Sequence, residues 1–110
     1  MTREAMIARF GGDEQLVAQL VELFVDECPR MIGDLRSSVE SGSAEALRRS
    51  AHAFKGCVAN FTDTGAVEAA RALETMGREG RVADAAATLV WLEREVDELL
   101  RAMRDCHARA

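Results

Sequence analysis

Residues 13–42 read DEQLVAQLVELFVDECPRMIGDLRSSVESG, with apolar residues recurring at spacings of three and four. This spacing predicts an amphipathic helix with one apolar stripe. The stripe consists of Leu16, Leu20, Leu23, Phe24, Cys28, Met31, Leu35 and Val39. Asp13 is suited to cap the start of this helix, and Ser41-Gly42 marks its end. Pro29 removes one helical hydrogen bond, so the pattern predicts either a kink or two nearly continuous helices.

Glycine and polar clusters divide the rest of the chain into further helical segments. Four of them are expected, over about residues 3–10, 43–61, 66–76 and 81–107. Ser43 is suited to cap the second of these, and the polar stretch 62–65 is expected to break it and cap the next. Short turns between amphipathic helices are typical of bundles. We therefore expect an all-α fold, an antiparallel four-helix bundle with a short extra N-terminal helix, forming a single domain over residues 1–110.

Composition agrees with this fold class and excludes several kinds of function. Nineteen alanines, ten leucines and a single proline in 110 residues favour helix over sheet. A net charge of −5 disfavours nucleic acid as the main partner, because phosphate binding needs a basic face. The apolar runs are too short to span a membrane, and no apolar segment follows the N-terminus as in a secretory signal. Three unpaired cysteines suit a reducing cytoplasm, and we expect a monomer.

The segment 43–61 places a histidine opposite its own apolar side. On a helical wheel the apolar residues gather together: Leu47, Ala51, Phe54, Val58 and Phe61. A second group lies within about 60° of His52 on the wheel: Glu45, Arg48, Arg49, Lys55, Gly56 and Ala59. We therefore expect His52 to point into solvent.

The residues alone leave two interpretations of His52 open. Helix geometry by itself favours an incidental histidine on a solvated face. Gly56 favours a functional site, because a glycine inside a helix costs about 1 kcal/mol relative to alanine and leaves the imidazole uncovered. Lys55, Arg48 and Arg49 form a local cationic patch that would stabilise an anion carried by the imidazole. A neutral imidazole nitrogen is also a good nucleophile.

A family resemblance rests on these same residues. The segment 51–56, AHAFKG, followed by Asn60-Phe61 and Gly65-Ala66, resembles the signature of histidine-containing phosphotransfer (HPt) domains. Flanking stretches resemble the same family's helices before and after the histidine: residues 10–13 (FGGD), residues 20–24 (LVELF), Pro29 and residues 69–80 (AARALETMGREG). The resemblance covers nearly the whole chain.

The resemblance implies a four-helix bundle that relays phosphoryl groups in bacterial-type multistep phosphorelays. His52 would accept a phosphoryl group from an aspartyl phosphate on a response-regulator receiver domain and pass it to another receiver. Lys55 would favour the phosphorylated state, and Gly56 would leave room for the receiver's active-site loop. Receivers and a hybrid sensor histidine kinase are the implied partners. The interface would be centred on His52 and use Glu45, Arg48, Arg49 and Ala59, with an apolar rim from exposed residues of the helix before it.

The domain is not expected to be an enzyme with its own turnover. It has no glycine-rich phosphate loop, no cofactor is expected, and no second catalytic group is expected to converge on His52. No acidic cluster is expected there to hold Mg²⁺, so the receiver would bring that ion. His107 beside Cys106 lacks the further ligands of a metal site and is interpreted as incidental.

Two alternatives to a relay carrier stay open. One is an interaction module that is not phosphorylated and that docks on a receiver or histidine kinase and inhibits it. The other is a kinase-attached variant, in which a separate ATP-binding domain phosphorylates the histidine directly.

Overall fold

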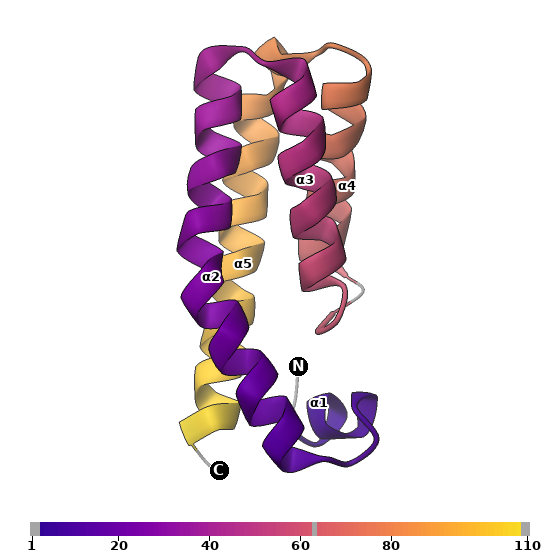
Figure 1. The fold of residues 1–110 in the computed structure, drawn as a ribbon, viewed down its shortest axis with the longest axis vertical. Coiled ribbons are helices and arrows are strands. Elements are labelled where there is room, and N and C mark those ends of the chain that lie inside the picture. The colour runs from indigo at the N-terminus through magenta and orange to yellow at the C-terminus, as the bar shows by residue number, and fades with distance from the viewer. Residues whose placement is uncertain (1–2, 63, 109–110) are drawn as a thin grey trace.

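The computed structural model describes residues 3–62 and 64–108, and every regular element in these ranges is helical. The elements are α1 (Arg3–Arg9), α2 (Glu14–Ser41), α3 (Ala44–Val58), α4 (Gly65–Arg78), the short 3-10 helix η1 (Val82–Asp84) and α5 (Ala85–Ala108). Helices α2 to α5 form an antiparallel bundle, and α1 is the extra N-terminal helix (Figure 1). The expected fold class is confirmed. Within the described ranges, no helix has both the length and the apolar character needed to cross a membrane.

The four long helices pack in a closed ring. Helix α2 packs on α3, α3 on α4 and α4 on α5, and α5 packs back on α2. In Figure 1, α2 and α5 run the length of the molecule, α3 and α4 fill its upper part, and α1 covers the lower end. The molecule is elongated, with extents of 42 × 19 × 18 Å. Helix α3 therefore has neighbours on two sides and a core behind it, and one face stays open to solvent.

Helix α2 is continuous from end to end. Asp13 caps it, accepting a hydrogen bond from the Leu16 amide at 3.0 Å, and Gly42 ends it in the left-handed conformation with φ +70°. Pro29 lies inside this single helix and is exposed, so the alternative of two nearly continuous helices is wrong. The hydrogen bond that proline lacks is lost on the solvent side, where the helix tolerates it.

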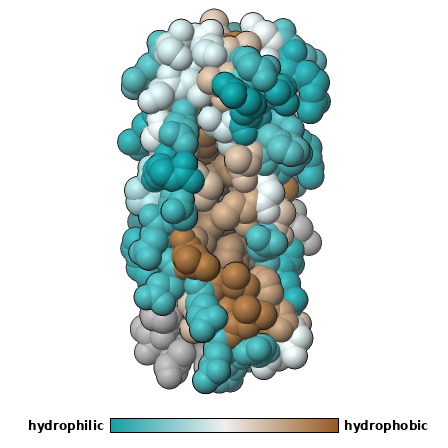
Figure 2. Space-filling model, viewed as in Figure 1, coloured by the Kyte–Doolittle hydropathy of each residue, from teal (hydrophilic) through white to brown (hydrophobic). Residues whose placement is uncertain are grey.

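In the first half of the predicted α2 stripe, Phe24 is buried and Leu20 packs against the core as expected, but Leu16 and Leu23 are wrong. Val17 and Val21 are buried, whereas Leu16 is 39% exposed and Leu23 is 61% exposed. The reason is that Val21 stands three residues before Phe24 and Val17 four residues before Val21, so spacing alone fits both rows. Figure 2 shows an apolar area on the lower half of the face that carries α2 and α3 in Figure 1.

Helix α3 ends at Val58, three residues before the expected end near Phe61. The guanidinium group of Arg9 donates hydrogen bonds to the carbonyl groups of Ala59 and Asn60, both at 3.0 Å. Since α1 satisfies these carbonyls, the chain can turn there, and the ring of Phe61 enters the core.

The starts of the last two helices also differ from expectation. The side chain of Thr64 makes no capping hydrogen bond to α4; its hydroxyl lies 3.0 Å from that of Thr62. Instead, the Glu95 carboxylate of α5 lies so close to Gly65 that any Cβ there would overlap it. The expected helix from Arg81 begins with η1, so α5 proper starts at Ala85. Asp63 and the side chains of residues 105–108 lie outside those described, and so does the interpretation of Cys106 and His107.

Candidate functional site

Helix α3 presents His52 on its open face, as expected. Leu47, Ala51, Phe54 and Val58 are fully buried against the core. The side chain of His52 points away from them and is 67% exposed. The sequence periodicity of α3 thus separates a core face from a face that a partner protein can reach.

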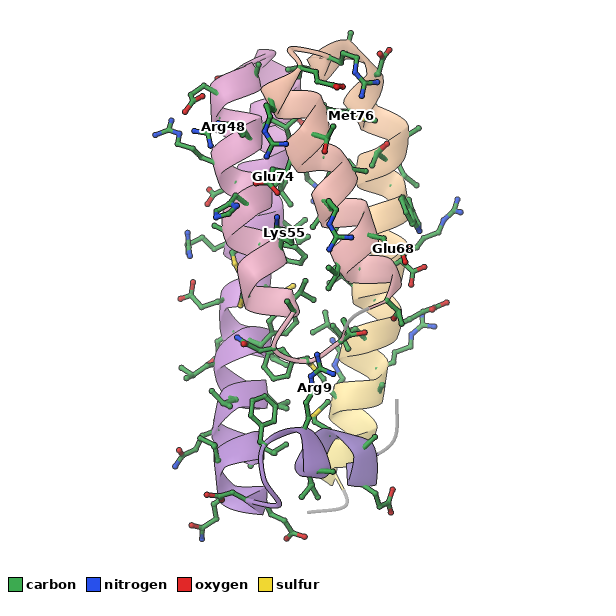
Figure 3. All side chains as sticks on the ribbon, turned by 90° about the vertical axis from the view of Figure 1, so that its right-hand side faces the viewer. Arg9, Arg48, Lys55, Glu68, Glu74 and Met76 are labelled. Carbon is green, nitrogen blue, oxygen red and sulfur yellow. The ribbon has the colours of Figure 1, made fainter. Side chains whose placement is uncertain are left out.

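Glu74 of α4 is the main feature of the site that the sequence argument missed. The residue is 4% exposed, and its carboxylate lies between α3 and α4 (Figure 3). One oxygen, Oε2, lies 2.7 Å from Nδ1 of His52, and the other, Oε1, accepts a hydrogen bond from Nζ of Lys55 at 2.5 Å. The sequence argument expected no second catalytic group at His52 and did not anticipate this ionisable group against the ring.

The ionisation of Glu74 determines which imidazole nitrogen carries the proton. A hydrogen bond from Lys55 lowers the pKa of Glu74, overcoming the opposite effect of burial, and the bond to His52 lowers it further. An ionised carboxylate can only accept hydrogen bonds, so Nδ1 of His52 must be the donor. In the neutral ring, Nε2 then keeps its lone pair. The site therefore presents Nε2 as a nucleophile, and the hydrogen bond from Nδ1 to Glu74 fixes the orientation of the ring.

Arg78 adds a further cation that was not predicted. It stands one turn after Glu74 on α4, with Nη2 3.5 Å from Oε2 of that carboxylate, and its side chain is largely exposed. Lys55 is half-buried beside the same carboxylate. Two cationic groups from different helices thus lie close to the histidine, where they can interact with an anion bound on the ring.

The expected cationic patch on α3 is partly offset by acidic side chains that pair with its arginines. Arg48 donates to Glu45 at 2.6 Å, and Arg49 lies 3.8 Å from the same carboxylate. Their pairing with Glu45, together with that of Lys55 and Glu74, offsets part of the positive charge. With Arg78 included, the named cations still outnumber the named carboxylates, so the region keeps a positive surplus.

The two small residues of the predicted site lie in open space. Gly56 is exposed in the last turn of α3, and a Cβ built there would meet nothing within 4 Å. Ala59 is exposed just past the end of the helix. The surface beside His52 is therefore flat on this side, although nothing inside the chain requires a glycine there.

A sequence signal for Glu74 exists, although it is a weak one. Glu74 stands four residues after Ala70 and three before Gly77, and both of these residues are buried. This spacing places a charged residue on the apolar face of its helix, where a carboxylate needs a partner. The sequence alone does not name that partner, because His52 lies twenty-two residues away. Among the described residues, no group of three or more His, Cys, Asp and Glu side chains could hold a metal ion.

The fold and site together define a helical bundle that presents a single oriented histidine. The family model of the Hpt domain matches residues 19–105, and the chain belongs to this family. Hpt domains are phosphotransfer carriers that work with the receiver or kinase proteins of two-component systems. The crystal structure of histidine-containing phosphotransfer protein B (HptB) from Pseudomonas aeruginosa PAO1 has a similar fold, with a TM-score of 0.89 at 24% identity. The match covers 97% of this chain and 93% of that one. No curated protein matches the chain.

Proposed function

We propose that this chain is a phosphorelay carrier with His52 as its phosphoacceptor. His52 would take a phosphoryl group from the aspartyl phosphate of one receiver domain and pass it to the aspartate of another. The domain supplies the nucleophile, and the receiver supplies Mg²⁺ and the rest of the phosphate site. A hybrid sensor histidine kinase stands upstream in this scheme.

One observation carries the proposal. His52 is exposed while Glu74 holds its Nδ1, so the lone pair of Nε2 faces the partner. An in-line transfer needs a positioned nucleophile and neutralisation of the phosphoryl oxygens. Lys55 and Arg78, which pair with different oxygens of Glu74, can provide the second requirement.

The proposed docking surface surrounds His52 on α3 and α2. Gly56 and Ala59 leave it flat, and the pairs of Glu45 with Arg48 and Arg49 provide charged groups at its upper end. Leu23 of α2, which is exposed, would contribute to the apolar rim that the family resemblance implies. A surface of modest size is typical of interfaces that must also dissociate.

A direct test follows the phosphoryl group. The purified chain would be mixed with a receiver that is phosphorylated on aspartate in the presence of Mg²⁺. We expect acid-labile, base-stable label on this chain, located at His52 by mass spectrometry at neutral pH. The variant His52→Gln should fold normally and take up no label, whereas His107→Gln serves as the matched control and should be labelled like the native chain.

Two outcomes would overturn the proposal. Label that persists in the His52→Gln variant would place the acceptor elsewhere. A stable complex with phosphorylated receivers but without transfer would instead support an interaction module that blocks its partner.

A further inference from the structure

Arg9 connects the short helix α1 to the end of α3. Its Nε donates a hydrogen bond to the carbonyl of Asn60 and its Nη2 donates one to the carbonyl of Ala59, both at 3.0 Å. Two apolar contacts hold α1 on the bundle independently of these bonds. Met6 is 1% exposed in the core, and the ring centroid of Phe10 lies 6.0 Å from that of Phe61. The guanidinium group is therefore held from both sides, by its own helix and by the two carbonyls.

The charge of Arg9 stays available although its orientation is fixed. Backbone carbonyls carry no net charge, so they orient the guanidinium group without neutralising it. Arg48 and Arg49, in contrast, pair with the carboxylate of Glu45. A guanidinium group has five N–H donors, and the two carbonyls use donors on Nε and Nη2. Since Arg9 is exposed, the donors on Nη1 can bind a group of another protein.

Arg9 lies at the lower edge of the proposed docking surface. Figure 3 shows it below the turn that follows α3, with Lys55 higher on that helix. Ala59, which Arg9 binds, follows His52 by seven residues, or about 10 Å along a helix. An interface of standard size covers about 800 Å² on each partner, which corresponds to a disc of about 16 Å radius. An interface centred on His52 therefore extends to Arg9 at its rim.

We propose that Arg9 is a contact residue for the receiver, binding a carboxylate at the edge of the receiver's docking face. This inference rests on the proposed carrier function and deepens it, because it names a residue that selects the partner. Guanidinium groups form charge-assisted, often paired hydrogen bonds with carboxylates. The two carbonyls already restrict the side chain in the free protein, so binding a partner costs less conformational entropy than it would for a mobile arginine.

The charge distribution of the chain favours an acidic partner at this surface. The chain has a net charge of −5, whereas the region around His52 keeps a positive surplus, and Arg9 extends that region toward α1. In the proposed transfer the receiver brings Mg²⁺, which proteins bind through carboxylates, so its facing surface carries acidic groups. Such a partner is repelled by most of this chain and attracted to the region from His52 to Arg9. Charges at a rim act mainly on the rate of encounter and on partner selection.

The test is a series of charges at position 9: Arg9→Lys, Arg9→Gln and Arg9→Glu. The matched controls are Arg81→Gln and Arg81→Glu. Arg81 is exposed and pairs with Glu79 in the connection between α4 and η1, at the end of the bundle opposite α1 (Figure 1). A phosphorylated, Mg²⁺-bound receiver is mixed with increasing concentrations of each chain. The concentration dependence separates the half-saturating concentration from the saturating rate of transfer.

Each series is measured at about 0.1 M and at about 1 M salt, between which the Debye length falls from about 10 Å to about 3 Å. At low salt the half-saturating concentration should rise in the order native, Arg9→Lys, Arg9→Gln and Arg9→Glu. We expect an increase of about two- to fivefold for Arg9→Gln. The proteins should converge at high salt, and the saturating rate should not change, because His52 and its neighbours are intact. The Arg81 variants should behave like the native chain.

A purely structural role for Arg9 predicts a different result. Loss of its bonds to Ala59 and Asn60 would disturb the turn after α3 in all three variants, without an order by charge. Equal effects in the three variants, or effects that are as large at high salt as at low salt, would overturn the inference. Urea unfolding measures how much stability each variant loses. Since all three variants lose the paired bonds to the carbonyls, an order by charge reports contact with the partner.

A second measurement needs no receiver. The proton on Nε of Arg9 gives its own signal in a ¹H–¹⁵N spectrum, and its exchange with water reports whether the guanidinium group is held. We expect slower exchange in the folded chain than in the urea-unfolded chain. Equal exchange rates would contradict a fixed guanidinium group and overturn the inference. A native chain that takes up no label at His52 would instead reject the proposed function, whichever result the Arg9 variants give.

Discussion

Gly77 of α4 lies directly against the backbone of Arg48 on α3. A Cβ at position 77 would lie 2.5 Å from the Arg48 amide nitrogen and 2.9 Å from the carbonyl oxygen of Ala44. The two helices therefore approach more closely than any side chain at this position allows. Glu74 stands one turn before Gly77, and His52 stands one turn after Arg48 on the antiparallel helix. The close approach at Gly77 is what brings the carboxylate within hydrogen-bond reach of the imidazole.

Gly77→Ala should push the two helices apart. We expect the free energy of unfolding to fall by about 1–3 kcal/mol, because the added methyl group meets backbone that cannot rotate away. The bond between His52 and Glu74 should weaken as well, so the ring ¹⁵N shifts of His52 should move in the folded variant. Urea unfolding measures the first effect. A variant as stable as the native chain, with unchanged shifts, would show that the interface adjusts without cost.

A substitution of alanine at Gly56 should have the opposite effect on the free energy of unfolding. No atom lies within 4 Å of a Cβ built there, so Gly56→Ala should raise the free energy of unfolding by up to about 1 kcal/mol through helix propensity. The larger side chain of Gly56→Gln should leave the fold intact but obstruct the receiver beside His52. We expect phosphotransfer to that variant to slow by at least about tenfold. Stopped-flow or quenched labelling measures the rate, and normal transfer would remove Gly56 from the docking surface.

The fold was predictable to the extent that local periodicity decides it. The core residues of α3, the Asp13 and Ser43 caps and the glycine at the end of α2 follow from nearest-neighbour rules, and the structure confirms them. The end of α3 did not follow, because Arg9, some fifty residues earlier, binds the carbonyls of the two residues just past it. The stripe on α2 was ambiguous, since two adjacent rows of apolar residues have the same spacing.

In the candidate site too, features determined by a single helix were predictable, and features that depend on packing between helices were not. The exposure of His52 and the open space at Gly56 are properties of one helix, and the sequence of that helix indicates both. The partnership with Glu74 joins two helices across twenty-two residues and depends on how closely they pack. Periodicity shows that Glu74 lies on a buried face, but only the packing shows which groups it meets there.

Glu74 should make the stability of the chain depend on pH in acid. Its pKa is lowered in the folded chain, first by the hydrogen bond from Lys55, so folding favours the ionised form. This contribution is fully present above about pH 4.3, the usual pKa of a free glutamate, and is lost as the pH falls through the lower folded pKa. At neutral pH, Glu74→Gln should destabilise the chain by about 1–3 kcal/mol.

Urea unfolding of the native chain and of Glu74→Gln over a series of pH values checks this linkage. The difference in unfolding free energy between the two proteins should be constant at neutral pH and should shrink in acid, where both carry an uncharged side chain at position 74. Glu68→Gln, which alters an exposed carboxylate, should show little difference at any pH. A difference between the native chain and Glu74→Gln that is as large in strong acid as at neutral pH would contradict the ion-pair explanation.

Cys28 and Cys57 should be poorly reactive in the native chain, and to different degrees. Cys28 is buried in α2, where burial, followed by the electrostatic influence of Cys57 and Asp97, raises the pKa of its thiol to about 11. Cys57 on α3 is half-buried, and burial and Glu27 raise its pKa as well. Since the thiolate is the reactive species, both should react slowly with iodoacetamide at neutral pH.

Cys28 should react essentially only when the chain unfolds, so its labelling rate should rise with urea in step with the unfolded fraction. Cys57 should also react slowly without urea. Peptide mapping by mass spectrometry separates the two sites. Rapid labelling of Cys28 in the absence of urea would mean that α2 opens locally beside the docking surface without global unfolding.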